Sequence, residues 1–134
     1  MTIPHPFIWH SAVQNNELDI QHIVNNAVYL QYFDRARIQY LLTKDIDWEE
    51  WHQNGFNLVL IHVDMAIKQS LKADDTFYVK STYEKSGRLK VIFNQTIYKK
   101  SDDTLVAKAI NTLVCVSVQS GKPVMPERLL ERLF

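Results

Sequence analysis

Residues 19–42 read DIQHIVNNAVYLQYFDRARIQYLL, and this stretch contains the only long helical pattern in the chain. Its apolar residues recur at helical spacing, at Ala27, Leu30, Phe33, Tyr40 and Leu41. Asn25 or Asn26 is a suitable N-cap, because a short amide side chain can accept a hydrogen bond from the first turn of a helix. The pattern therefore predicts a helix over Asn26–Leu42.

Inside this helix, Asp34 and Arg37 are three residues apart. Side chains at that spacing are neighbours on a helix surface and can form an ion pair. We therefore expect the two to pair on the polar face of the helix.

On both sides of the helix the pattern is that of strands. After Gly55 the apolar period changes to two residues, and Val, Ile, Thr, Tyr and Phe are abundant. Strands are predicted at 7–13, 56–68, 76–85, 89–100 and 105–118, with short helices at 47–54 and 126–134. Ser86-Gly87 and Ser101-Asp102-Asp103 read as hairpin turns, which join antiparallel neighbours. This order predicts an α+β fold in which one long helix packs on one face of an antiparallel sheet.

Composition limits the function. The chain has 134 residues, so we expect a single domain over 1–134. Its 15 basic and 15 acidic residues give a net charge of +0, which argues against nucleic acid as a partner. The start of the chain lacks a basic region followed by a long apolar run, and no apolar stretch is long enough to span a bilayer. The expected location is therefore the cytoplasm, with no membrane partner.

Asp19 is the residue with the clearest chemical use, because it lies in a loop a few residues before a helix N-terminus. Free backbone N–H groups and a partial positive charge at that end can stabilise an oxyanion formed on a thioester carbonyl. A nearby carboxylate can attack the carbonyl or deprotonate a water molecule. On spacing alone the simpler interpretation is that Asp19 only caps the turn, because capping acids are common.

The segment resembles the signature of hotdog-fold thioesterases of the 4-hydroxybenzoyl-CoA thioesterase type. The matching residues are Asp19, Val24, Asn25, Asn26, Tyr29, Tyr32, Phe33, Ala36 and Arg37, with Asp34 in place of the usual Glu. Further similarities lie in Lys72-Ala73-Asp74-Asp75 and Ser120-Gly121-Lys122-Pro123, so the resemblance covers essentially the whole chain. It implies a hotdog fold, in which a curled antiparallel sheet wraps around the long helix.

The same resemblance implies roles for individual residues. Asp19 matches the catalytic carboxylate, and Asn26 lies where a backbone N–H contacts the thioester oxygen. His22 stands where the family usually has Gly, and Ile23 stands where many members have His. His22 either narrows the pocket, contributes a polar group, or is an exposed loop residue. The related acyl-carrier-protein thioesterases have Asn and His where this chain has Gln21 and Ile23.

Other candidate sites are weaker. Arg88 and Lys90 flank a hairpin and could meet the phosphates of coenzyme A, although a solvated turn is the simpler interpretation. The aromatic residues Trp48, Trp51 and Phe56 could line an acyl pocket but more often form a core. Cys115 lies in an apolar strand and is expected in the core, while the facing of His62 stays open. The five histidines show no metal-ligand spacing, so no metal site is expected.

The resemblance thus implies an enzyme that hydrolyses an acyl-CoA thioester to a carboxylic acid and free coenzyme A, without a cofactor. An acyl-carrier-protein thioesterase and a non-catalytic acyl-binding protein are the alternatives. Because one helix covers a long sheet only in part, we expect a homodimer or homotetramer.

Overall fold

The computed structural model describes residues 5–134. Residues 1–4 belong to the N-terminal segment on which the expected cytoplasmic location partly rests, and they lie outside the described part. The elements, in chain order, are β1 (Phe7–Ala12), the 3-10 turn η1 (Asn15–Glu17), α1 (Asn26–Leu42), α2 (Trp48–Gln53), β2 (Phe56–Ile67), β3 (Thr76–Ser86), β4 (Lys90–Lys99), β5 (Leu105–Ser117), β6 (Pro123–Val124) and α3 (Glu127–Leu133). Every helix and strand expected from the sequence is present, with ends that differ by one residue or so. Only the two-residue strand β6 and the turn η1 were not expected.

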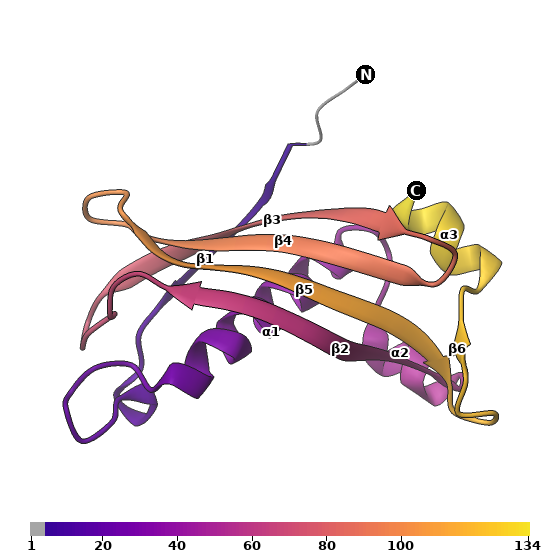
Figure 1. Cartoon of the computed structure of the whole chain (residues 1–134), viewed down its shortest axis with the longest axis horizontal. Coiled ribbons are helices and arrows are strands. Elements are labelled where there is room, and N and C mark those ends of the chain that lie inside the picture. The colour runs from indigo at the N-terminus through magenta and orange to yellow at the C-terminus, as the bar shows by residue number, and fades with distance from the viewer. Residues whose placement is uncertain (1–4) are drawn as a thin grey trace.

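The strands form one antiparallel sheet with the order β1-β3-β4-β5-β2, and β6 pairs with β5. Figure 1 shows the four long strands lying side by side as a twisted, open sheet. The sheet is not closed, so β1 and β2 are its two edge strands. The antiparallel α+β plan expected from the hairpin turns is confirmed.

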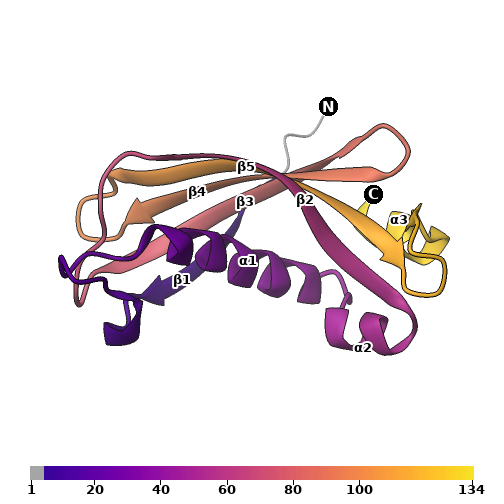
Figure 2. The same ribbon diagram turned by 60° about the horizontal axis from the view of Figure 1, so that its bottom comes forward.

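Helix α1 crosses one face of the sheet, as Figure 2 shows. On that face β4 presents a buried row of alternate side chains, Val91, Phe93, Gln95 and Ile97. The facing side of α1 contributes Tyr29, Tyr32, Phe33 and Ala36, all with an exposed fraction of 1% or less. Each large apolar side chain buried in this way stabilises the fold by about 1.5–3 kcal/mol, which fixes the helix on the sheet.

Short helices complete the core at the other end of α1. Asp47 caps α2 by accepting a hydrogen bond from the Glu49 backbone N–H at 3.0 Å. Gly55 follows α2 with a φ of 94°, a conformation that favours glycine. Trp51 of α2 and Leu129 of α3 are buried in the same cluster, which confirms core packing for part of the aromatic group.

The position of Arg37 corrects the expectation that it lies on the polar face of the helix. The ion pair with Asp34 is present at 3.3 Å, but the Arg37 side chain is only 5% exposed and does not lie on a polar face. It points into the core, where its Nη1 donates to Oε1 of Gln95 at 3.0 Å. Asn111 donates to the same oxygen at 2.9 Å, and Gln95 donates to Ser81. Helical spacing could not reveal this network, because its acceptors come from the strands.

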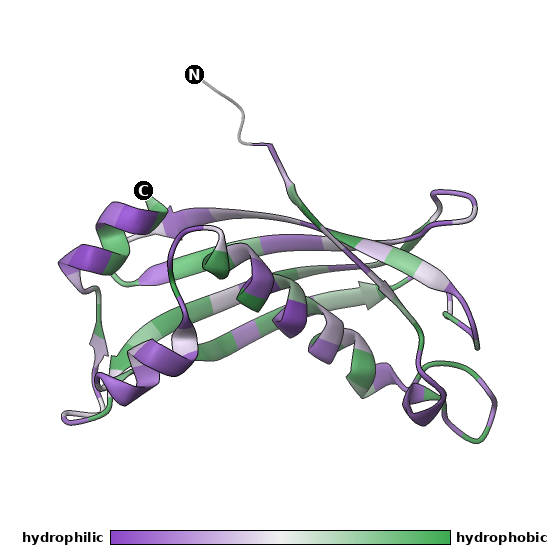
Figure 3. Cartoon of the chain, turned by 180° about the vertical axis from the view of Figure 1, so that it is seen from behind, coloured by the Kyte–Doolittle hydropathy of each residue, from purple (hydrophilic) through white to green (hydrophobic). Residues whose placement is uncertain are grey.

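The opposite side of α1 lies in front of the sheet without a second layer of described residues over it, as Figure 3 shows. That side includes the exposed apolar side chains of Ile38 and Leu42 among polar ones. In this hotdog fold, one helix packs on one sheet, so the outer side of α1 and the outer edges of the edge strands are not covered by other described elements.

Candidate functional site

The loop between η1 and α1 is a tight, hydrogen-bonded turn. The backbone N–H of Asp19 donates to the carbonyl of Ile23 at 2.8 Å, and that of His22 donates to the carbonyl of Asp19 at 3.0 Å. Leu18 and Val24 pair across the base of the loop as an antiparallel bridge. These contacts hold Asp19 close to the start of α1.

The Asp19 carboxylate is partly used by its own loop. Its Oδ1 accepts the backbone N–H of Gln21 at 2.8 Å and that of Ile23 at 3.4 Å. No hydrogen-bond donor to Oδ2 is found within residues 5–134. The side chain is half-buried. One oxygen therefore orients the carboxylate through the backbone of its own loop.

The N-terminus of α1 is capped on one side only. Asn25 is the N-cap, and its side-chain oxygen accepts the N–H of Ala27 at 3.0 Å, while its carbonyl accepts the N–H of Val28 at 2.9 Å. Asn26, the first helical residue, is exposed, and its N–H finds no acceptor among the described residues. The first turn contains no acidic residue, so the partial positive charge of this end is not neutralised from within the helix.

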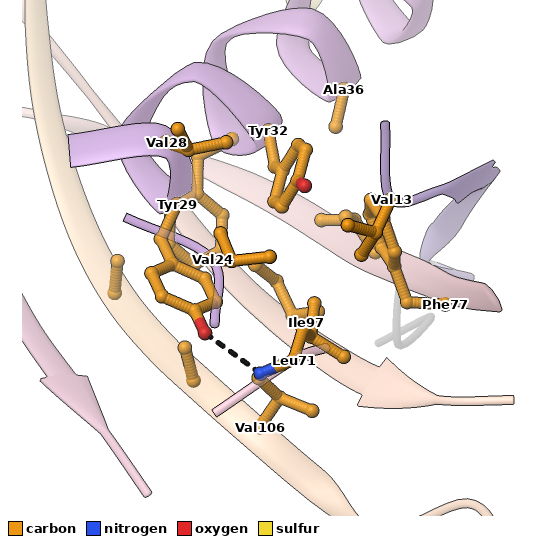
Figure 4. Packing of buried hydrophobic residues seen from close by; sticks show 14 residues of the cluster. Val13, Val24, Val28, Tyr29, Tyr32, Ala36, Leu71, Phe77, Ile97 and Val106 are labelled. Carbon is orange, nitrogen blue, oxygen red and sulfur yellow. Dashed lines mark hydrogen bonds between the residues drawn. The ribbon is translucent and has the colours of Figure 1, made fainter. Parts of the chain in front are cut away.

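A second segment supports the loop from the sheet side. Val24 donates its N–H to the carbonyl of Leu71 at 2.9 Å, and Ile23 pairs with Lys72. The hydroxyl of Tyr29, on α1, accepts the N–H of Leu71 at 3.0 Å, which Figure 4 shows as a dashed line. Burial raises the pKa of Tyr29, so this hydroxyl is protonated at neutral pH and can act as a fixed neutral partner.

His22 adopts a left-handed backbone conformation with a φ of 63°. Residues with a Cβ atom rarely adopt it, which gives a physical reason for the glycine found at this position in the resembling family. The His22 side chain is exposed, and Ile23 is half-buried. His22 thus carries a side chain at a position whose backbone conformation favours glycine.

Arg88 and Lys90 lie far from this loop within one chain. Asp75 and Thr76 at the start of β3 adjoin the loop end of the molecule, whereas the β3–β4 hairpin that carries both cations lies at its opposite end (Figure 1). Ten steps along β3 span about 33 Å at about 3.3 Å each. The cation that does adjoin the loop is the exposed Lys72, which the sequence did not single out as a ligand.

A groove of about 480 Å³ lies between the second half of α1 and the edge strand β2. Its apolar lining includes Ile38, Leu41, Leu58 and Leu60. Trp48 also lines it, and its buried Nε1 has no acceptor among residues 5–134. Asp34 and Arg37 add polar atoms to the same groove. Trp48 thus lines this groove, whereas Trp51 and Phe56 line a smaller pocket beside α3, and Trp51 is also part of the core.

Two of the remaining candidates take clear positions. Cys115 is buried, as expected, and burial raises the pKa of its thiol to about 11. His62 is exposed and pairs with Thr112, so it does not belong to the core.

Within residues 5–134 no group of three His, Cys, Asp or Glu side chains is placed to hold a metal ion. In the same range no helix is long and apolar enough to cross a membrane.

Glu17 is a site residue that the sequence did not reveal. The polar run 14–17 suggests an exposed break after β1, yet the Glu17 side chain is only 6% exposed. Its carboxylate accepts hydrogen bonds from Tyr32 and Arg35 of α1. Its burial could not be predicted from local sequence, because the fold brings Tyr32 and Arg35 to it from α1.

The chain is similar to known proteins. The family model of the thioesterase-like superfamily matches residues 13–133 of this chain. Protein AQ1494 from Aquifex aeolicus, known from a crystal structure, has 33% sequence identity to the chain. Its structure superposes with a TM-score of 0.88, covering 96% of this chain and 100% of that one.

Two relatives carry names that describe an activity. The long-chain acyl-CoA thioesterase FadM of Escherichia coli is 27% identical over 123 residues, which cover 90% of this chain and 92% of FadM. The chloroplastic acyl-acyl carrier protein thioesterase ATL3 of Arabidopsis thaliana is 30% identical over 100 residues, which cover 73% of this chain and 53% of ATL3.

Proposed function

Because the chain belongs to the thioesterase-like superfamily and has a hotdog fold, we propose that it hydrolyses an acyl-CoA thioester to a free carboxylic acid and coenzyme A. The observation that carries the proposal is the Asp19 carboxylate, in the loop that leads into α1, where the Asn26 N–H has no acceptor and Oδ2 of Asp19 no donor among the described residues. The name of FadM, a relative that matches over most of its length, supports the acyl-CoA class. The helix-entry motif further supports the 4-hydroxybenzoyl-CoA thioesterase type.

The chemistry follows from these two groups. The thioester oxygen accepts the backbone N–H of Asn26, and the helix N-terminus stabilises the negative charge that develops on it. Oδ2 of Asp19 either attacks the carbonyl carbon or removes a proton from an attacking water. The tetrahedral intermediate then collapses, the C–S bond breaks, and the thiolate of coenzyme A takes up a proton. When water is the nucleophile, this collapse gives the carboxylic acid directly; when Asp19 is the nucleophile, it leaves an acyl anhydride on Asp19, which water then hydrolyses to the acid and the free carboxylate. The net reaction consumes one water and needs no cofactor.

We propose that the groove between α1 and β2 receives the acyl chain. Its volume is about 480 Å³ and its lining is largely apolar, as acyl recognition requires. Within one chain it starts near Asp34, eight residues into α1, or about 12 Å along the helix axis from Asn26. If two copies pair antiparallel along β2, the end of one copy's β2, which leads to the loop support at Leu71, approaches the groove of the other. The site would then be shared between subunits.

The test is thiol release from a panel of acyl-CoA substrates by the wild type and by Asp19→Asn. The asparagine keeps an oxygen that can accept from Gln21 and Ile23, so the loop should stay folded while the reactive carboxylate is lost. We expect kcat to fall by about 10²–10⁴-fold, the usual contribution of a general base. An Asp19→Asn enzyme that keeps most of its activity contradicts the role of Asp19.

A second experiment determines whether the acyl chain is carried by coenzyme A or by acyl-carrier protein. The relative ATL3, whose name specifies acyl-carrier protein, is the observation that favours this alternative. Offering the same acyl chain on coenzyme A and on acyl-carrier protein tells the two apart by kcat/KM. Acyl-CoA binding without turnover on either carrier would instead identify a non-catalytic acyl-binding protein.

A further inference from the structure

We propose that Glu17 is a positioning residue that locks the Asp19 loop onto helix α1. The inference deepens the proposed function, because it concerns the residue that holds the catalytic carboxylate in place. Its basis is a buried acidic side chain two residues before Asp19 that none of the reaction steps uses.

The Glu17 carboxylate is fully engaged. Its Oε1 accepts the hydroxyl of Tyr32 and the backbone N–H of Gln14, both at 2.8 Å. Its Oε2 accepts Nη1 of Arg35 at 3.3 Å. A carboxylate is rarely buried unless such donors compensate the loss of water. The arrangement therefore joins the start of the loop to the middle of α1 through side chains.

The backbone of Glu17 makes the other half of the lock. Its carbonyl accepts the N–H of Asn25, the N-cap of α1, at 3.0 Å. One residue thus binds the helix at its N-cap through the main chain and two turns further on through the side chain. Asp19 lies inside the segment closed by these two contacts, so its distance from the helix N-terminus depends on them.

The hydrogen bond from Tyr32 to Glu17 is buried and does not depend on pH near neutrality. Tyr32 is fully buried, and its pKa is raised first by burial and then by its hydrogen bond to Glu17. The phenol therefore stays protonated at neutral pH and donates to the Glu17 carboxylate. Arg35, in contrast, is half exposed, and an ion pair of that kind contributes little. The expected order of importance is Tyr32 before Arg35.

The variants separate positioning from general stability. Glu17→Ala removes the side-chain lock, while Glu17→Gln keeps an oxygen that can accept from Tyr32 and Gln14. Leu129→Ala in α3 is the matched control, since it deletes a fully buried side chain at the opposite end of the molecule. All variants are assayed at a temperature where each is folded, with Tyr32→Phe as a milder second probe.

We expect Glu17→Ala to lower kcat at least about 10-fold with KM within about twofold, because small displacements of a reacting group are costly in rate. Glu17→Gln should recover most of kcat, and Tyr32→Phe should show a smaller loss of the same kind. Leu129→Ala should lose stability and keep its kcat. If Glu17→Ala loses no more kcat than Leu129→Ala, or if KM rises instead, the proposal is overturned.

Hydrogen exchange gives a readout that does not need activity. The amides of Gln21 and Ile23 donate to Asp19, so they should exchange faster in Glu17→Ala than in the wild type and be unchanged in Leu129→Ala. Unchanged exchange at both amides would overturn the lock even in an active enzyme. A wild type that hydrolyses no thioester would defeat the proposed function, while the exchange experiment would still decide whether Glu17 holds the loop.

Discussion

His22 combines a side chain with a backbone conformation that favours glycine. At a φ of 63° a residue with a Cβ atom pays a conformational cost of about 1–2 kcal/mol. From the sequence alone, glycine at this position would be expected to cost about 0.4–1 kcal/mol by loosening the unfolded chain. The observed conformation reverses that sign, because relief of the strain outweighs the entropy term.

We therefore expect His22→Gly to raise the free energy of unfolding by about 1 kcal/mol, measured by urea denaturation. If the side chain narrows the entry to the site, KM or the range of acyl chains also changes. If it donates a proton, kcat falls and one titration disappears from the pH–rate profile. We expect the steric outcome.

Asp45→Gly is the matched control, since Asp45 is exposed, has a φ of 57° and follows α1 at its far end. It should gain similar stability with unchanged kinetics. Kinetics of His22→Gly that match the wild type for every acyl length would leave His22 as an ordinary loop residue.

Cys115 illustrates how burial decides the chemistry of a residue. With the pKa raised to about 11, about one thiol in a thousand is ionised at pH 8, compared with roughly a quarter for a thiol of pKa 8.5. The thiolate appears only as the pH rises toward that value. We expect the folded enzyme to resist a thiol-specific reagent at pH 8 and to retain full activity. The same sample in denaturant should release one thiol; rapid loss of activity in the folded state would contradict a purely structural role.

At the scale of elements, the N-terminus of α1 links stability to catalysis. Asn25→Ala removes the cap of Ala27 and should lower the free energy of unfolding by about 1 kcal/mol. It should also reduce kcat, since a frayed first turn no longer fixes the Asn26 N–H. Asn26→Ala is the control: its backbone N–H is retained, so stability and kcat should stay near the wild-type values. An equal loss of kcat in both variants would point to the Asn26 side chain instead.

The elements were predictable because their signals are local. Period-two runs, hairpin turns and a long helical repeat each depend on neighbouring residues, and the structure reproduces them almost to the residue. The position of Asp19 before α1 was predictable for the same reason. Arg37 and Glu17 were not, because their burial depends on Gln95 and Tyr32, partners that the fold brings from distant segments. Arg88 and Lys90 could be named only as possible phosphate contacts beside the simpler interpretation of a solvated turn, because the sequence does not show which end of the sheet they occupy.

At the scale of the whole molecule, the edge strand β2 is the feature that favours association with a second copy of the chain. Its twelve residues pair only with β5 among the described residues, which leaves its other edge open. Val59 and Ile61 are 38% and 48% exposed on this strand. Long apolar edge strands that are neither charged nor covered tend to pair with another chain. We therefore expect two copies to join antiparallel along β2.

The expected dimer is tested by light scattering at micromolar concentration, with the double variant Val59→Lys/Ile61→Lys as the probe. Lysines on an edge strand oppose pairing because two like-charged strands repel and each ammonium group loses water. We expect the wild type to have twice the mass of the chain and the double variant to be a monomer. The variant should also lose most of its thioesterase activity while remaining folded, because the groove beside β2 then lacks the second copy's loop and because Val59 itself lines that groove. Ile110→Lys is the control, since Ile110 is 46% exposed but lies on β5, whose two edges are already paired. It should leave the dimer and its activity intact, whereas a wild type that is monomeric yet fully active would exclude both the β2 interface and a site shared across it.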